Sequence, residues 1–243
     1  MVEFQRKDFY SYEDFLEIMR LLRAPGGCPW DREQTHGSIR RNFLEETYEV
    51  LDAIDHDDAH GMCEELGDVL MQVAFHAQIE AERGRFTMAD VVNGVAQKLV
   101  YRHPHVFGDV QADTSQQVLN NWEVLKRREK GQRSTADAVE SVPHTLPALW
   151  RAEKIQSKTA KAGFDWSGVL QALDKLEEEV RELRAALEAG QAPDAPHGVR
   201  EELGDTLFMA AKVAQMSGLD PEDALHRACD MARMAERRTL PLE

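Results

Sequence analysis

Carboxylate side chains recur along this chain in two groups that share one spacing. The first group pairs Glu-Glu-x-x-Glu with Glu-x-x-Asp and comprises Glu45, Glu46, Glu49, Glu65 and Asp68. The second group repeats that order and comprises Glu178, Glu179, Glu182, Glu202 and Asp205. Positions three or four apart lie on one face of a helix, so two adjacent helices can direct four carboxylates toward one point. Oxygen ligands of this kind suit Mg²⁺ or Mn²⁺, and the spacing therefore favours a divalent-metal site.

An acidic helix that only faces solvent is the alternative interpretation, and a single Glu-rich helix would favour it. The repeat argues against it, because Glu-Glu-Leu-Gly-Asp-x-Leu occurs at both 64–70 and 201–207. A glycine inside a helix costs about 1 kcal/mol relative to alanine. A glycine beside the acids in both copies therefore predicts close approach of another helix or of a ligand.

Helical periodicity dominates the elements that must position these acids, and convincing alternating strands are absent from the sequence. The expected helices cover 15–22, 42–54, 64–81, 87–100, 115–130, 149–162, 169–189, 200–216 and 221–238. Thr87 is expected to cap the fourth of them. The sequence thus predicts an all-α protein of two similar halves, 1–135 and 149–243, with a linker at 136–148 that contains Pro143 and Pro147.

Composition limits the class of protein. The chain has 243 residues, 42% of them hydrophobic, which is enough for an ordinary globular core. Its formal net charge of -15 disfavours a nucleic-acid or anionic-membrane partner, since the cations that neutralise phosphates are too few. Cys28, Cys63 and Cys229 form no C-x-x-C pair and are expected to be reduced and mostly buried. The first ten residues lack an apolar core, and no apolar run approaches 18 residues, so we expect a cytoplasmic protein.

Four stretches of this sequence resemble the MazG-like nucleoside triphosphate pyrophosphohydrolases of the all-α NTP pyrophosphohydrolase superfamily. They are Cys-Pro-Trp-Asp-Arg-Glu-Gln-Thr-His at 28–36, the two paired acidic motifs, Lys-x-x-x-Arg-His-Pro-His-Val-Phe at 98–107, and the junction at 143–166. The resemblance covers nearly the whole chain. It implies a tandem repeat of two MazG-like helical-bundle domains that associates as a homodimer. It also implies Mg²⁺-dependent hydrolysis of a nucleoside triphosphate to the monophosphate and pyrophosphate, with Mn²⁺ as a possible substitute.

The resemblance also implies a ligand set for the metal. The ligands in the first half would be Glu46, Glu49, Glu65 and Asp68, and their equivalents would be Glu179, Glu182, Glu202 and Asp205. Glu45 has no ligand position of its own. It can orient or deprotonate the attacking water, or it can accept a hydrogen bond beside the ligands, and both roles stay open.

Substrate contacts follow from the same resemblance. Lys98 and Arg102 stand four apart on one helix and would contact the triphosphate, although alone they would be taken as solvated surface cations. Trp122 and Lys126 fit a segment that closes over the nucleotide in this family, where an aromatic ring can stack on a base. A structural role for Trp122 in a buried position is the alternative.

The second half departs from this pattern. Met231 and Ala235 occupy the positions that correspond to Lys98 and Arg102, and the sequence ends before a counterpart of Trp122. Three arginines in a shifted register can replace the missing cations: Arg233, Arg237 and Arg238. We therefore expect the complete site in the first half and a degenerate, truncated domain in the second.

Two rival functions remain at this stage. One is hydrolysis of a related pyrophosphate such as dUTP or phosphoribosyl-ATP. The other is a non-catalytic helical protein that senses nucleotides or binds a partner, with acids that hold metal without turnover. The cations Lys98 and Arg102 favour catalysis over sensing.

Overall fold

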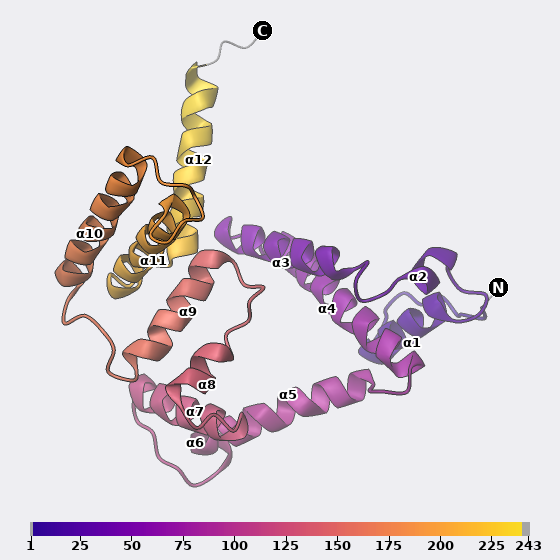
Figure 1. The fold of residues 1–243 in the computed structure, drawn as a ribbon. Coiled ribbons are helices and arrows are strands. Elements are labelled where there is room, and N and C mark those ends of the chain that lie inside the picture. The colour runs from indigo at the N-terminus through magenta and orange to yellow at the C-terminus, as the bar shows by residue number, and fades with distance from the viewer. Residues whose placement is uncertain (1, 240–243) are drawn as a thin grey trace. The chain divides into compact units, whose positions relative to one another are not determined.

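The computed structural model describes residues 2–239, with side chains described up to residue 232, and every regular element in that range is a helix (Figure 1). The helices are α1 (Tyr12–Arg23), α2 (Pro29–Glu33), α3 (Arg40–Asp55), α4 (Ala59–Glu82), α5 (Met88–Arg102), α6 (Pro104–Phe107), α7 (Ser115–Glu129), α8 (Thr135–Glu140), α9 (Ala148–Ala160), α10 (Val169–Glu188), α11 (Val199–Met216) and α12 (Pro221–Thr239). The predicted all-α class is confirmed. The nine long helices were expected within a few residues of these bounds, whereas the short helices α2, α6 and α8 were not.

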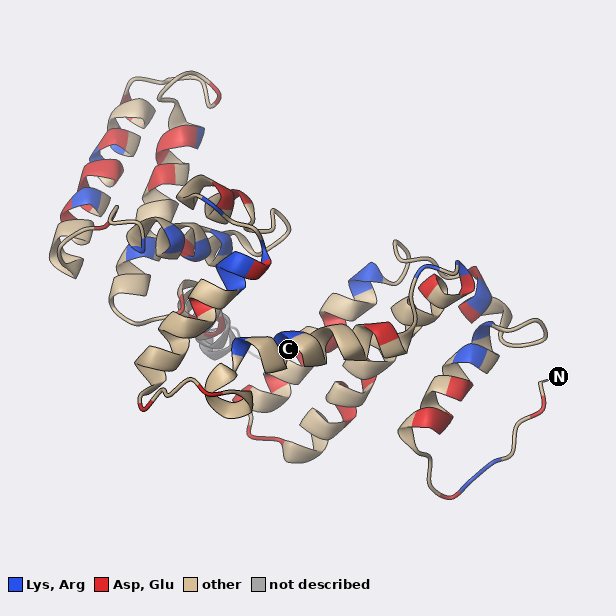
Figure 2. Cartoon of the chain, turned by 90° about the horizontal axis from the view of Figure 1, so that it is seen from below, with Lys and Arg blue, Asp and Glu red and all other residues tan. Residues whose placement is uncertain are grey.

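The chain divides into two compact units between Trp122 and Glu123, within α7. Each unit contains one pair of long helices joined by a short connection, α3 with α4 in the first and α10 with α11 in the second. These two pairs carry the two acidic groups, and Asp and Glu recur along their helices in Figure 2. The predicted tandem repeat of helical domains is thus present in the architecture.

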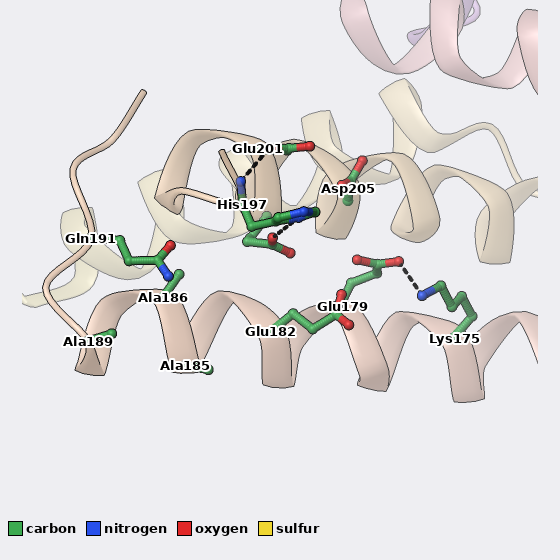
Figure 3. Close-up of a pocket in the computed structure, with 11 residues that line it drawn as sticks. Lys175, Glu179, Glu182, Ala185, Ala186, Ala189, Gln191, His197, Glu201 and Asp205 are labelled. Atoms are coloured by element: carbon green, nitrogen blue, oxygen red, sulfur yellow. Dashed lines mark hydrogen bonds and ion pairs between the residues drawn. The ribbon is translucent and has the colours of Figure 1, made fainter. Parts of the chain in front are cut away.

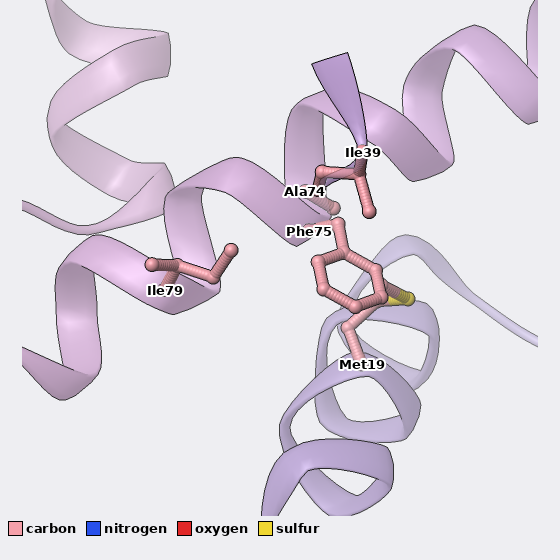
Figure 4. Close-up of a cluster of buried hydrophobic side chains, with 5 residues drawn as sticks. All are labelled: Met19, Ile39, Ala74, Phe75 and Ile79. Carbon is pink, nitrogen blue, oxygen red and sulfur yellow. The ribbon is translucent and has the colours of Figure 1, made fainter. Parts of the chain in front are cut away.

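The core of the first unit lies where α1 crosses the C-terminal half of α4 (Figure 4). Five buried side chains make up this cluster: Met19, Ile39, Ala74, Phe75 and Ile79. The guanidinium of Arg23 lies over the Phe75 ring, donates to the Asp31 carbonyl and pairs with Glu82 at 2.8 Å. The core therefore fixes one end of α4 and leaves the end that carries Glu65 and Asp68 to pack against α3.

A tight turn sets the pairing of α3 with α4. Asp57 has a φ of 53°, and the Asp58 carboxylate accepts hydrogen bonds from the backbone N–H groups of His60 and Gly61 at 3.1 and 3.0 Å. A side-chain acceptor at this position stabilises a helix start by roughly 1 kcal/mol. The helix begins at Ala59 because of this cap, so the acids of α4 face those of α3.

In the second unit, α9 packs against α11 and α12, while α10 packs against α11. The start of α11 leaves no room for a side chain at Gly198, where an added Cβ would lie 2.6 Å from the carbonyl oxygens of Ala192 and Ala195. Lys212 is buried on the same helix, 2.6 Å from Asp165 and with its ammonium 5.7 Å from the centre of the Trp166 ring. This contact anchors the junction that precedes α10 to α11.

The structure differs from the predicted linker at 136–148. Helix α8 fills 135–140 and packs against α9, because Ser134 and Asp137 form a capping box in which each caps the backbone N–H of the other. The polar composition of this segment predicted a linker, although it forms a short helix in which Ala138 is buried. The second compact unit thus begins before the predicted start at 149.

The expected burial of the cysteines needs correction. Cys63 and Cys229 are exposed, and only Cys28 is half-buried, so the expectation that the cysteines are mostly buried is wrong. The two exposed thiols lie on the solvent sides of α4 and α12. Within 2–239, no helix combines the length and the apolar character needed to cross a bilayer.

Candidate metal centre

The first acidic group converges as its spacing predicted. Carboxylate oxygens of Glu46 and Glu49 on α3 and of Glu65 on α4 lie within 4.8 Å of one another. Asp68 follows Glu65 by one turn of α4, and its charge raises the pKa of both Glu46 and Glu65. The α3–α4 turn therefore brings three predicted ligands together and places the fourth beside them.

The electrostatics of this group are unfavourable without a cation. Burial raises the pKa of Glu46 above its ordinary value of 4.5, and the charges of Asp68 and Glu49 raise it further. The pKa of Glu65 is also raised, first by loss of hydration and then by the Glu49 charge. The neighbouring charges that affect these two carboxyls most are negative. A bound divalent cation would relieve this repulsion, and the hard oxygen donors fit Mg²⁺ or Mn²⁺.

Gln72 is a site residue that the sequence interpretation missed. It is buried on α4, one turn beyond Asp68, and its side chain lies close enough to Glu46 to lower the pKa of that carboxyl, against the larger effects that raise it. Its Oε1 atom is buried and has no hydrogen-bond partner among the described residues. The four-residue step from Asp68 was a readable signal, since it places Gln72 on the acidic face of the helix.

Two open pockets flank the first group. One, of about 350 Å³, is lined by Glu49, Asp52, Ala53, His56, Asp58, Gly61 and Glu65. The other, of about 560 Å³, is lined by Arg41, Leu44, Glu45, Tyr48, Glu49 and Asp52. Glu49 belongs to both pockets, whereas Glu45 lines only the second. Glu45 therefore lies beside the three converging carboxylates but faces the second pocket. Of those three, only Glu49 also lines that pocket.

The glycines beside the acids do not mark a close helix contact. A Cβ added to Gly67 or to Gly204 would meet no atom within 4 Å. In the described part of the chain no helix approaches these positions, so the first of the two predicted alternatives is wrong, and the approach of a ligand stays a prediction. The space is free for a ligand or for a second copy of the chain.

The predicted substrate-binding residues form a separate group. Lys98 is exposed near the end of α5, a helix that packs against α4 and α6. Neither Lys98 nor Arg102 lines the two pockets at the acids. The Arg102 guanidinium instead lies over the Trp122 ring, 5.3 Å from its centre, and Lys126 follows Trp122 by one turn of α7. The structure thus joins two predicted substrate contacts to each other and leaves them apart from the acids.

The second acidic group also converges, in a more buried setting (Figure 3). Carboxylate oxygens of Glu179, Glu202 and Asp205 lie within 4.8 Å of one another, and Glu179 and Glu202 are buried. Glu182 projects beside them, and its pKa is raised by loss of hydration and then by the Glu179 charge. The group borders a pocket of about 590 Å³ whose other lining residues are Lys175, Ala185, Ala186, Ala189, Gln191, His197 and Glu201.

Two cationic or titratable side chains accompany this second group, and the sequence interpretation did not include them. The Lys175 ammonium lies 2.8 Å from Glu179 Oε1 and 2.8 Å from Glu178 Oε1. His197 Nδ1 lies 3.6 Å from Glu202 Oε1. Lys175 stands three and four residues before these glutamates, which is the spacing of helical ion pairs and was therefore readable. The predicted replacement of the missing cations by Arg233, Arg237 and Arg238 concerns side chains that lie outside the described residues.

Comparison with known proteins identifies relatives over most of the chain. The family model described as the MazG nucleotide pyrophosphohydrolase domain matches residues 34–107 and again 168–238. A protein of Escherichia coli K12 named nucleoside triphosphate pyrophosphohydrolase is 45% identical over 214 residues, which cover 88% of this chain and 81% of that protein. A Thermotoga maritima protein named nucleoside triphosphate pyrophosphohydrolase/pyrophosphatase MazG is 43% identical over 217 residues, covering 89% of this chain and 80% of that protein. The two matched segments contain the two acidic groups.

Proposed function

The chain belongs to the MazG nucleotide pyrophosphohydrolase family, and on that premise we propose that its first acidic group is the metal centre of the reaction. The protein is a nucleoside triphosphate pyrophosphohydrolase, which cleaves the bond between the α- and β-phosphates and releases the monophosphate and pyrophosphate. The proposed metal ligands are Glu46, Glu49, Glu65 and Asp68. The observation that carries this proposal is the convergence of three carboxylates from two helices, in which the charges that most affect Glu46 and Glu65 are negative.

The proposed division of labour follows from the chemistry of phosphoryl transfer. Bound Mg²⁺ supplies neutralisation of the charge that develops on the phosphate oxygens. Glu46 and Glu49 from α3 hold it together with Glu65 and Asp68 from α4. Gln72 orients Glu46 through its amide. Lys98 and Arg102 bind the triphosphate through charge-assisted hydrogen bonds, and the Trp122 ring with Lys126 covers the nucleotide.

Glu45 is our candidate for accepting a proton from the attacking water. It lies next to Glu46 in the sequence and lines the neighbouring open pocket. Glu45→Gln keeps a hydrogen-bond acceptor but removes the base. If Glu45 is the general base, the base-dependent rise of the rate with pH is lost in this variant, whereas a hydrogen-bonding role leaves the shape of the pH profile unchanged.

A product assay tests the proposed reaction at this site. Purified protein is incubated with ordinary and modified nucleoside triphosphates, with Mg²⁺, with Mn²⁺ and after chelation, and the products are separated by chromatography. Monophosphate and pyrophosphate are expected only when metal is present. Diphosphate and orthophosphate as the first products would contradict the assignment, and a marked preference for dUTP or phosphoribosyl-ATP would identify a specialised member of the family. Nucleotide binding without turnover would favour the sensing alternative.

We also propose a homodimer, supported by apolar side chains that the chain leaves uncovered. Helix α5 exposes Val91, Val92, Val95, Leu99 and Val100, and α3 and α4 expose Leu51, Ile54, Leu66 and Leu70. Contiguous exposed apolar surface of this kind usually marks an interface. Light scattering is expected to give twice the chain mass for the parent protein and the chain mass for Val95→Asp with Leu99→Asp. A monomeric parent protein would remove the proposal.

A further inference from the structure

A lysine ammonium already occupies the edge of the second acidic group. The Lys175 Nζ atom lies 2.8 Å from Glu179 Oε1 (Figure 3). It also lies 2.8 Å from Glu178 Oε1, and both distances are within the range of charge-assisted hydrogen bonds. Glu179 is one of the three acids whose oxygens converge. The ammonium is therefore bonded directly to one of the carboxylates that a metal ion would need.

Burial distinguishes this ion pair from an ordinary pair on a helix surface. Exposed lysine–glutamate pairs three or four residues apart contribute only a few tenths of a kcal/mol. The Glu179 side chain, however, is 9% exposed, and Glu202 beside it is also buried. Charges removed from water interact more strongly, so a buried carboxylate with one nearby ammonium holds it more firmly than a surface carboxylate does.

The first acidic group has no such lysine. Counting from the Glu-Glu-x-x-Glu motif, the position of Lys175 corresponds to Asn42, which carries no charge. The walls of the two pockets also differ at two corresponding positions. The first pocket has Asp52 and His56 where the second has Ala185 and Ala189. The second half has thus kept the acids, placed a lysine ammonium directly against one of them, and has alanines in place of Asp52 and His56.

We infer that the Lys175 ammonium is the resident cation of the second acidic group, and that this half therefore binds a divalent ion far more weakly than the first half. A divalent ion bound to Glu179 would have to displace the ammonium or sit a few ångströms from it, and either costs binding energy. The second group then serves to hold α10 and α11 together, and the chain has one metal centre. The inference uses the proposed function only to identify the first group as the reference site.

Direct counting of bound Mn²⁺ tests this without reference to turnover. The free Mn²⁺ signal in electron paramagnetic resonance is titrated for the full chain and for a first-group variant, Glu49→Gln with Asp68→Asn. We expect this variant to lose the tight sites of the parent protein and to bind Mn²⁺ at least about tenfold more weakly. Adding Lys175→Asn, which copies the residue at Asn42, is expected to restore binding by about tenfold or more.

Matched variants identify the restored site. Lys154→Asn removes a positive charge from the exposed side of α9 and should restore nothing. Glu202→Gln with Asp205→Asn should abolish whatever Lys175→Asn restores. Lys175→Met, which keeps most of the stem, guards against a local defect specific to asparagine, and circular dichroism with light scattering shows that each variant is folded and assembled.

Two results would overturn the inference. One is a first-group variant that keeps Mn²⁺ affinity within about threefold of the parent protein, because the second group would then bind metal with Lys175 in place. The other is unchanged binding in both Lys175→Asn and Lys175→Met. A parent protein that binds no Mn²⁺ would contradict the proposed metal centre, and the inference about Lys175 would still stand or fall by whether Lys175→Asn alone creates a site.

Discussion

Each of the two acidic groups lies on a pair of packed helices, and their spacing in the sequence is the same. The repulsion between the clustered carboxylates is compensated differently in the two groups. In the first, burial and neighbouring carboxylates raise the pKa of Glu46 and of Glu65. In the second, burial and the Glu179 charge raise the pKa of Asp205, and the Lys175 ammonium, which lies 2.8 Å from Glu179, offsets this only in part. Within the part of the chain that the structure describes, the first acidic group has no ammonium bonded to its carboxylates, whereas the second has that of Lys175. The same motif can therefore mark a metal centre or a structural contact, depending on one neighbouring residue.

A second difference lies in the buried residue beyond the aspartate. Gln72 in the first half corresponds to Met209 in the second, counted from the Glu-x-x-Asp motif, and both are buried. Gln72 offers an amide to Glu46, whereas a thioether offers only a weak acceptor. The first acidic group, which has Asn42 at the position of Lys175, thus has a buried amide next to its acids. The second group, which has Lys175, has a thioether at the corresponding position.

The largest effect should come from removing metal ligands in one half at a time. Glu49→Gln with Asp68→Asn is expected to reduce turnover to background, because the amides keep the shape but lose the charge that holds the metal. Glu182→Gln with Asp205→Asn should reduce kcat/KM by less than about threefold, under about 1 kcal/mol. Both are assayed at saturating Mg²⁺, with dimerisation checked by light scattering. Normal Mg²⁺-dependent activity in the first variant would break the comparison.

Removing the phosphate-binding cations should have the next largest effect. Lys98→Ala with Arg102→Ala removes the two proposed charge-assisted contacts to the triphosphate, of roughly 1.5–3 kcal/mol each, so kcat/KM should fall at least about a hundredfold. Because Arg102 also stacks on Trp122, circular dichroism must show that α5 and α7 remain folded. An active first-half variant together with an inactive second-half variant would reverse the assignment and point to Arg233, Arg237 and Arg238.

Exchanging Gln72 and Met209 tests whether the buried residue one turn beyond the aspartate contributes to the difference between the two acidic groups. Gln72→Met gives the first half the residue of the second and is expected to weaken Mg²⁺ affinity by about tenfold, because Glu46 loses the amide that orients it. The activation constant for Mg²⁺ measures this, and kcat at saturating Mg²⁺ should change less. The reciprocal Met209→Gln should give no new metal binding. An unchanged Mg²⁺ constant in Gln72→Met would leave Gln72 a packing residue only.

The smallest expected effect is on the stability of the metal-free protein. Because the folded-state pKa of Glu46 is raised above its ordinary 4.5, ionisation destabilises the fold as pH rises through that pKa. Glu46→Gln should therefore raise the free energy of unfolding at pH 7 by up to about 0.5 kcal/mol, and the gain should vanish near pH 4, where the carboxyl is protonated. Urea titrations at the two pH values, in chelator, measure the difference. A loss of stability at pH 7 would show that Glu46 is paired in the metal-free protein.

The sequence by itself determined the helices and the two acidic faces. Periodicity, the Thr87 capping box and the spacing of three and four residues depend on contacts within one or two turns, and such contacts are visible along the chain. The same local rule would have shown the pairing of Lys175 with Glu178 and Glu179. It did not show α8, because six polar-flanked residues are too few to display a period.

Only the tertiary structure decided how each acidic group is compensated and what lies around it. The burial of Glu179 and Glu202, the unpaired Oε1 of Gln72 and the stacking of Arg102 on Trp122 all depend on distances between segments far apart in the sequence. The open space at Gly67 was likewise invisible, because a glycine signals that a side chain is absent and not what fills its place. Charge spacing is a local property of a helix, whereas the cost of a charge depends on everything packed around it.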